Sequence, residues 1–126
     1  MVKLLITFVV LVLCAAAAGG QVDVERSKIE YLISSVEGLQ GTKFIRNGVA
    51  YDGKEAAAHL RMKLKRAGPR VRTAEDFIRV CASKSYLSGR PYSIKLPNGK
   101  EIMAEEFFTK ALKKYHSPES PNHPKP

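Results

Sequence analysis

The chain has 126 residues, of which 21 are Lys or Arg and 12 are Asp or Glu, so its net charge is +9. A chain of this length has room for one hydrophobic core and little for a second, which excludes a large multidomain enzyme. The positive charge favours partners that carry negative charge. A surface that only keeps the protein in solution is the other interpretation of that charge.

The first 20 residues have the features of a secretory signal peptide. Lys3 supplies a positive charge, residues 4–13 are apolar apart from Thr7, and residues 15–20 are all small. We therefore predict a cleaved signal peptide over residues 1–20 and no membrane span after cleavage. The mature protein is then expected in the periplasm, or outside the cell if the source lacks an outer membrane.

Four amphipathic helices are predicted from the spacing of the apolar residues. Asp23 is placed to cap the first helix and Gly38 to end it. Asp52 has capping-box spacing before the second helix, which Gly68 ends. Thr73 is a good N-cap for the third, and Asp76 can reach back to it in a short version of the capping box. The four ranges are 24–37, 53–67, 74–82 and 104–115. The residues expected to face the core include Leu64 in the second helix and four in the first, Ile29, Leu32, Ile33 and Val36.

Two short antiparallel hairpins are also expected. Asn47–Gly48 lies between β-favouring flanks at 44–46 and 49–51, although an isolated tight turn is the alternative there. Residues 92–96 and 100–102 enclose a second turn signal, Pro-Asn-Gly, and predict a hairpin with better strands. Tyr92, Ile94 and Leu96 are expected to face the helices.

These elements predict a helix-dominated α+β fold with one or two hairpins. The folded part is expected to be a single domain over residues 21–115. The tail, residues 116–126, is rich in proline and polar residues, and we predict that it is disordered.

The residues capable of chemistry do not form a recognisable catalytic or metal-binding pattern. His59 lies one helical turn after Glu55, which could orient it as a base, but a histidine at the rim of the core is the more common arrangement. Cys81, alone once cleavage removes Cys14, lies on the inward stripe of its helix. We predict no catalytic residue, no metal and no cofactor.

The polar loop 83–90 is the better candidate for a binding site. Its serines, its glycine and the adjacent Lys84 and Arg90 are suited to an anionic group. A dense basic stretch, residues 61–72, would complete a cleft through Arg61, Lys65, Arg70 or Arg72. The predicted ligand-binding residues are Arg46, Asn47, His59, Lys63, Ser83, Ser85, Ser88, Gly89 and Arg90.

Four segments resemble a known bacterial family. They are Phe44-Ile45-Arg46-Asn47-Gly48, His59-Leu60-Arg61-Met62-Lys63-Leu64, Thr73-Ala74-Glu75-Asp76-Phe77-Ile78 and Ser83-Lys84-Ser85-Tyr86-Leu87-Ser88-Gly89-Arg90-Pro91-Tyr92. In this order they look like the YfeK-like family of small exported proteins. The resemblance covers about residues 29–112 and implies a periplasmic setting in a Gram-negative bacterium, but no activity.

Three functions are therefore carried forward. The first is a non-enzymatic binding or accessory module for an anionic envelope polymer or a protein partner, without specific recognition of nucleic acid. The second is an envelope hydrolase or transferase that uses His59, Glu55 and a serine of the 83–90 loop. The third is a partner-binding domain that uses an exposed apolar patch.

Overall fold

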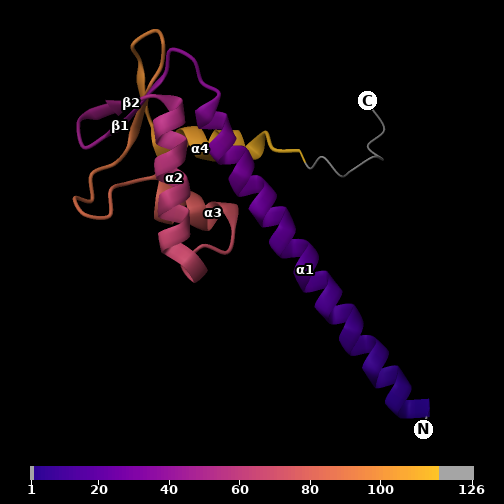
Figure 1. Ribbon diagram of the computed structural model, residues 1–126. Helices are drawn as coiled ribbons and strands as arrows, with labels where there is room; N and C mark the ends of the chain where they lie inside the picture. Colours follow the sequence, from indigo (N-terminus) through magenta and orange to yellow (C-terminus); the bar gives the residue numbers. More distant parts are fainter. Residues whose placement is uncertain (1, 117–126) are drawn as a thin grey trace, which may run out of the picture.

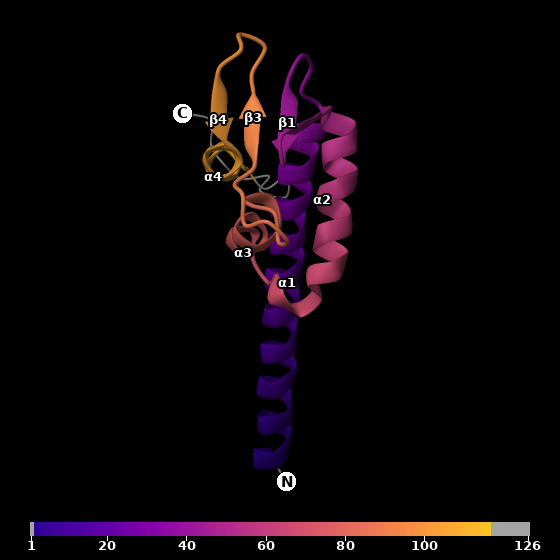
Figure 2. The same ribbon diagram turned by 90° about the vertical axis from the view of Figure 1, so that its left-hand side faces the viewer.

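Helix α1 (Val2–Glu37) is the longest element of the computed structural model, and the other elements gather around its C-terminal half (Figures 1 and 2). The structure describes the backbone of residues 2–116 and the side chains of residues 20–116. The side chains of nearly the whole predicted signal peptide lie outside the described residues. So do residues 117–126 of the tail that was predicted to be disordered. None of the described helices combines the length and hydropathy of a membrane span.

The start predicted for the first helix is wrong, whereas its end is confirmed. Helix α1 runs through Asp23, because the leucines and alanines before it also favour a helix. It ends at Glu37, and Gly38 follows as predicted. The four apolar residues predicted to face the core are buried; they are Ile29, Leu32, Ile33 and Val36.

Helix α2 (Gly53–Ala67) lies alongside α1 and has the predicted limits (Figure 2). The carboxylate of Asp52 accepts a hydrogen bond from a backbone N–H of the first turn at 2.8 Å. At the other end Gly68 has a φ of 53°, which terminates the helix. Gly53 lets the two helices approach closely, because a Cβ there would collide with the carbonyl oxygen of Val36.

The third predicted helix changes its winding halfway. A 3₁₀ turn, η1 (Gly68–Arg70), leads to α3 (Ala74–Phe77), and a π-helical turn, η2 (Ile78–Ala82), follows directly. The predicted capping box is confirmed. The Thr73 hydroxyl accepts a hydrogen bond from the backbone N–H of Asp76 at 3.0 Å, and the Asp76 carboxylate accepts one from the N–H of Thr73 at 3.3 Å.

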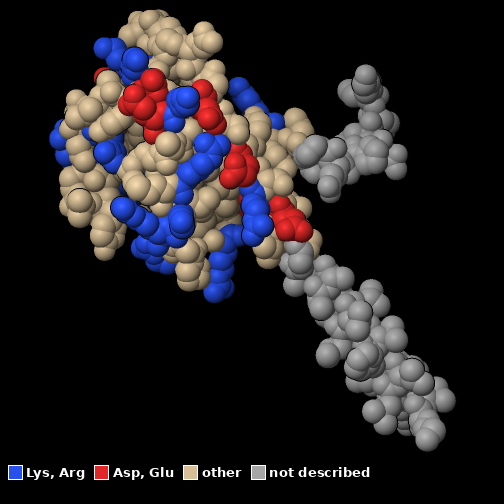
Figure 3. Space-filling view, in the orientation of Figure 1, with Lys and Arg blue, Asp and Glu red and all other residues tan. Residues whose placement is uncertain are grey.

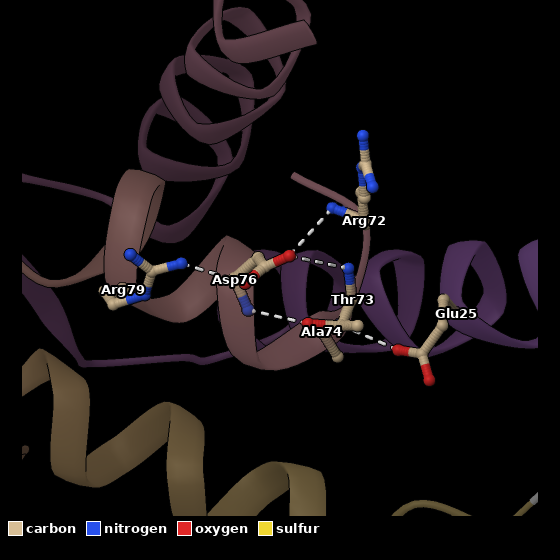
Figure 4. Close-up of polar contacts among 6 residues, drawn as sticks. All are labelled: Glu25, Arg72, Thr73, Ala74, Asp76 and Arg79. Carbon is tan, nitrogen blue, oxygen red and sulfur yellow. Dashed lines mark hydrogen bonds and ion pairs between the residues drawn. The ribbon is translucent and has the colours of Figure 1, made fainter. Parts of the chain in front are cut away.

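Figure 4 shows how this helix start is held against α1. The backbone N–H of Ala74 donates to the carboxylate of Glu25 at 2.8 Å. The carboxylate of Asp76 also accepts hydrogen bonds from the backbone N–H of Arg72 at 3.0 Å and from the guanidinium of Arg79 at 2.9 Å. We call the six residues labelled in Figure 4 the capping corner.

Both predicted hairpins form, and they join in one antiparallel sheet of order β2-β1-β3-β4. In the first turn Asn47 and Gly48 have φ values of 50° and 77°, as in a type I′ turn. The sequence predicted the hairpins but not the pairing of β1 with β3. The strands are β1 (Lys43–Arg46), β2 (Val49–Tyr51), β3 (Ser93–Lys95) and β4 (Glu101–Met103).

Helix α4 (Ala104–Lys113) closes the core. Its Phe108 is buried and packs edge-on against Phe77 of α3, with the ring centroids 6.5 Å apart. Leu64 and Leu96, predicted to face inward, are only partly buried. The helix-dominated α+β class is confirmed.

Candidate functional site: a basic pocket beside α2

The inner face of the sheet carries two polar side chains into contact with α2. Phe44 is buried, and Arg46 lies two residues further along the same strand. Ile94 is also buried, and Tyr92 lies two residues before it. Because alternate residues of a strand share a face, Arg46 and Tyr92 point toward the helical side.

Helix α2 and the turn after it supply the remaining positive charges. Lys63 and Arg66 lie one turn apart on α2, and Arg70 follows in η1. Together with Arg46 they line a cavity of about 620 Å³, the basic pocket. Figure 3 shows Lys and Arg atoms gathered around the C-terminal end of α2 on the face that it draws.

The other lining residues of the basic pocket fall into two groups. Buried or half-buried side chains form its floor, and exposed or half-buried side chains form its rim. The floor residues are His59, Ala67, Cys81, Ser85 and Tyr92. The rim residues are Met62, Val80, Tyr86 and Leu87.

Lys63 is held at the floor of the pocket. Its ammonium donates to the Tyr92 hydroxyl at 3.0 Å and to the Lys84 carbonyl at 3.0 Å, and it lies 4.7 Å from the centroid of the Tyr92 ring. An ammonium has three N–H donors, so one remains for a ligand. Burial, with a smaller contribution from Arg46, lowers the pKa of Lys63 below its ordinary value.

His59 interacts with Arg46 and not with its predicted partner. Its Nε2 lies 2.8 Å from one terminal guanidinium nitrogen of Arg46, and the other terminal nitrogen donates to the Tyr51 hydroxyl at 3.1 Å. Among the described residues no hydrogen bond joins His59 to Glu55. Burial and the positive charges of Arg46 and other nearby cations lower the pKa of His59 to about 4, so the ring is neutral at pH 7.

Part of the predicted loop lines the pocket, but its serine hydroxyls are bonded to Asn47 and to the backbone of the loop. Ser85 is buried, and its hydroxyl accepts a hydrogen bond from the Asn47 amide at 3.4 Å. The Ser88 hydroxyl donates to the Asn47 side-chain oxygen at 2.7 Å and accepts from the backbone N–H of Arg90 at 3.2 Å. These contacts tie the loop to the β1–β2 turn.

The structure places the other predicted residues outside the pocket lining. The Ser83 hydroxyl donates to the carbonyl of Ile78, which matches the wide spacing of the π turn. Gly89 has a φ of 68° in the loop, and Arg90 is exposed. Of the nine predicted residues, the structure brings Arg46, His59, Lys63 and Ser85 together around the cavity.

The basic stretch does not act as one surface. Arg61 forms ion pairs with Glu37 at 3.2 Å and Glu30 at 3.8 Å, on the side of α1, so its predicted place in the cleft is wrong. Of the four cations proposed to complete the cleft, Arg70 lines it. Arg66, which was not singled out, does so too, and its i+3 spacing from Lys63 could have found it.

Cys81 lies at the floor of the pocket and is fully buried. Burial raises the pKa of its thiol, although Lys63 and Arg70 oppose this in part. At neutral pH the sulfur is therefore a thiol and not the thiolate that nucleophilic catalysis requires. This position does not support a catalytic pair with His59.

The fold and the pocket together define a small helix-dominated α+β domain with a cationic cavity. The chain belongs to a family of unknown function, DUF5329, which matches residues 23–116. It is similar to the uncharacterized protein YfeK of Salmonella typhimurium (strain LT2), with 35% identity over 91 residues, 71% of this chain and 76% of the relative. The YfeK-like resemblance is thereby confirmed. No solved structure matches the chain.

Proposed function

We propose that this protein is exported and acts as a non-enzymatic module that holds an anionic component of the cell envelope in the basic pocket. One observation carries the proposal. Four cations from β1, α2 and η1 line the same cavity, and no Asp or Glu is among its lining residues. Like charges held together raise the energy of the molecule, and a bound anion relieves that cost.

The ion pairs of the described residues also leave the cations of the basic pocket unpaired with a carboxylate. They use Lys28, Arg61, Arg79 and Lys110 as their cations, none of which lines the basic pocket. A second cavity, of about 580 Å³, is lined by both signs of charge, including Glu75 and Glu105. Of these two cavities, the basic pocket is therefore the one that suits an anion.

The proposal of export is supported by the residues before the domain. Lys3, the apolar run that follows it and the small residues up to Gly20 form the pattern of a signal peptide. The family match begins at residue 23, just after that pattern. An exported basic protein meets anionic lipids and polymers of the envelope.

The hydrolase alternative gains no support from the arrangement of its residues. The Ser85 hydroxyl is engaged by Asn47, and the imidazole of His59 lies against Arg46. A histidine that activates a serine needs that serine within hydrogen-bond reach. We therefore propose binding and not catalysis.

The test is the binding of inorganic polyphosphate and of lipopolysaccharide to the purified protein, at low and at high salt. We expect the double variant R66Q/R70Q to lose about tenfold or more in affinity, because charge-assisted hydrogen bonds are among the strong ones. Affinity should also fall as salt increases. The matched control is K65Q/R72Q, which removes the same charge from exposed side chains that do not line the pocket.

Two results would contradict the proposal. One is affinity that does not change with salt. The other is an equal loss in R66Q/R70Q and K65Q/R72Q, which would show that overall charge and not the pocket attracts the anion.

A further inference from the structure

The rim of the basic pocket is apolar, although the pocket is surrounded by positive charge. Met62 and Val80 flank the cavity, and Tyr86 and Leu87 are 84% and 94% exposed. A site for a bare inorganic anion has no use for such side chains. Exposed apolar residues beside a cavity are typical of a surface that another apolar group covers.

The loop that presents Tyr86 and Leu87 is held by hydrogen bonds. The backbone N–H of Ser85 donates to the carbonyl of Arg90 at 3.0 Å, and the N–H of Gly89 donates back to the carbonyl of Ser85 at 2.9 Å. The Ser88 hydroxyl fixes the same turn to Asn47. The backbone that carries the two apolar side chains is therefore held at the rim of the pocket.

Part of the positive charge of the pocket lies deeper than its apolar rim, since Lys63 is half-buried whereas Arg66 and Arg70 are exposed. Lys63 and Tyr92 meet at the floor, where the phenol is buried and accepts the ammonium N–H. Met62 lies one residue before Lys63 on α2 and is half exposed. A ligand that reaches Lys63 with a negative group would carry its remaining atoms past Met62 and Leu87.

The geometry points to an anionic amphiphile as the ligand, that is, a phosphate or carboxylate group that carries an apolar chain. The head group binds Arg46, Lys63, Arg66 and Arg70, and the chain lies against the rim. This inference rests on the proposed function and names its ligand class. A lipid in a bilayer and a free amphiphile share this chemistry, and the experiment below separates them.

A flat membrane surface or a protein surface would use only part of this site. Either could cover Tyr86 and Leu87, but Lys63 lies at the floor, where its ammonium donates to the hydroxyl of the buried Tyr92. A single chain with a charged end can occupy both regions at once. The cavity of about 620 Å³ falls in the size range of small-molecule sites.

The experiment compares inorganic phosphate with butyl phosphate and with monomeric dodecyl phosphate, using calorimetry on the full-length protein. We expect affinity to rise with chain length, by about tenfold for every two methylene groups that are buried. The double variant Y86S/L87S should lose most of this gain and keep the affinity for inorganic phosphate. The control V22S/V24S removes two exposed apolar side chains far from the loop in sequence.

Chemical shifts of the His59 ring give a second readout that locates the ligand. A bound anion offsets the nearby positive charges, so it should raise the pKa of His59 from about 4. Dodecyl phosphate should produce this rise, and the neutral detergent dodecyl maltoside should not. An unchanged pKa with dodecyl phosphate would place the ligand elsewhere and overturn the inference.

The two proposals fail in different ways. If inorganic phosphate and dodecyl phosphate bind equally, and both depend on Arg66 and Arg70, the proposed function stands and the amphiphile is excluded. If neither ligand depends on these arginines, both proposals fail. Binding to phosphatidylglycerol vesicles without binding to monomeric dodecyl phosphate would identify the loop as a membrane-docking surface and would also overturn the inference.

Discussion

The capping corner and the basic pocket use polar side chains in opposite ways. In the corner, the carboxylates of Glu25 and Asp76 receive backbone N–H groups, and Asp76 also pairs with Arg79. In the pocket, cations contact a hydroxyl, an imidazole and a ring, and no carboxylate is among the lining residues. The difference teaches that charge balanced within the chain supports the fold, whereas charge left without a counter-ion is available to a ligand.

The largest expected effect comes from giving the pocket its own carboxylate. In the variant M62E the new carboxylate lies one turn before Arg66, in the favourable order of an i,i+4 pair. It should compete with an anionic ligand and reduce the affinity for dodecyl phosphate about tenfold or more, while stability stays the same or rises slightly. Calorimetry and chemical denaturation measure the two quantities.

The matched control for this change is M103E, on strand β4. Met103 is half exposed, as Met62 is, but does not line the pocket. We expect M103E to bind the ligand as the unaltered protein does. Equal losses in M62E and M103E would show that the pocket has no special role and that the comparison with the corner is wrong.

The converse change removes a cap from the corner. Thr73→Ala deletes the hydroxyl that accepts an N–H of the first turn, and such caps contribute about 1 kcal/mol to the free energy of unfolding. We expect T73A to unfold at lower denaturant concentration and to bind dodecyl phosphate normally. T109A, at an exposed position of α4, is the control and should change stability little. A T73A protein of full stability would remove the structural role assigned to the corner.

A smaller effect is expected on the pH dependence of stability, and it comes from His59 in the pocket. The pKa of His59 is lowered from 6.5 to about 4, so the unfolded chain binds a proton there more readily than the folded chain does. The resulting stability is fully present above about pH 6.5 and is lost as the pH falls toward 4. In H59N, the denaturant concentration at the midpoint of unfolding should therefore change less with pH across this range.

The control for the pH profile is H116N, at an exposed position at the end of the described chain. We expect this variant to keep the slope of the unaltered protein between pH 6.5 and 5. If H59N kept that slope as well, the pKa of His59 could not be the cause.

The smallest expected effect concerns the reactivity of Cys81 at the floor of the pocket. Because Cys81 is fully buried and its pKa is raised, we expect a thiol reagent to label it slowly in the folded protein and rapidly after unfolding. Labelling is followed by mass spectrometry at the residue. Rapid labelling of Cys81 in the folded state would show that the floor opens to solvent and that the thiol is reactive.

Local signals in the sequence were sufficient for most of the secondary structure. Asp52 and Gly68 set the limits of α2, and Thr73 with Asp76 forms the predicted capping box. These features act over three or four residues, so the residue types alone decide them. The failure at Asp23 has the same origin, since a good cap does not stop a helix whose preceding residues also favour it.

The candidate site depended on contacts that no local signal encodes. The sequence by itself determined four helical segments, two hairpins and a surplus of positive charge. Only the tertiary structure decided that β1 pairs with β3, that Arg46 meets His59, and that Arg66 faces the pocket while Arg61 turns to α1. The physical reason is that a helix or hairpin forms from neighbouring residues, whereas its packing partner is chosen by the burial of a core shared among distant segments.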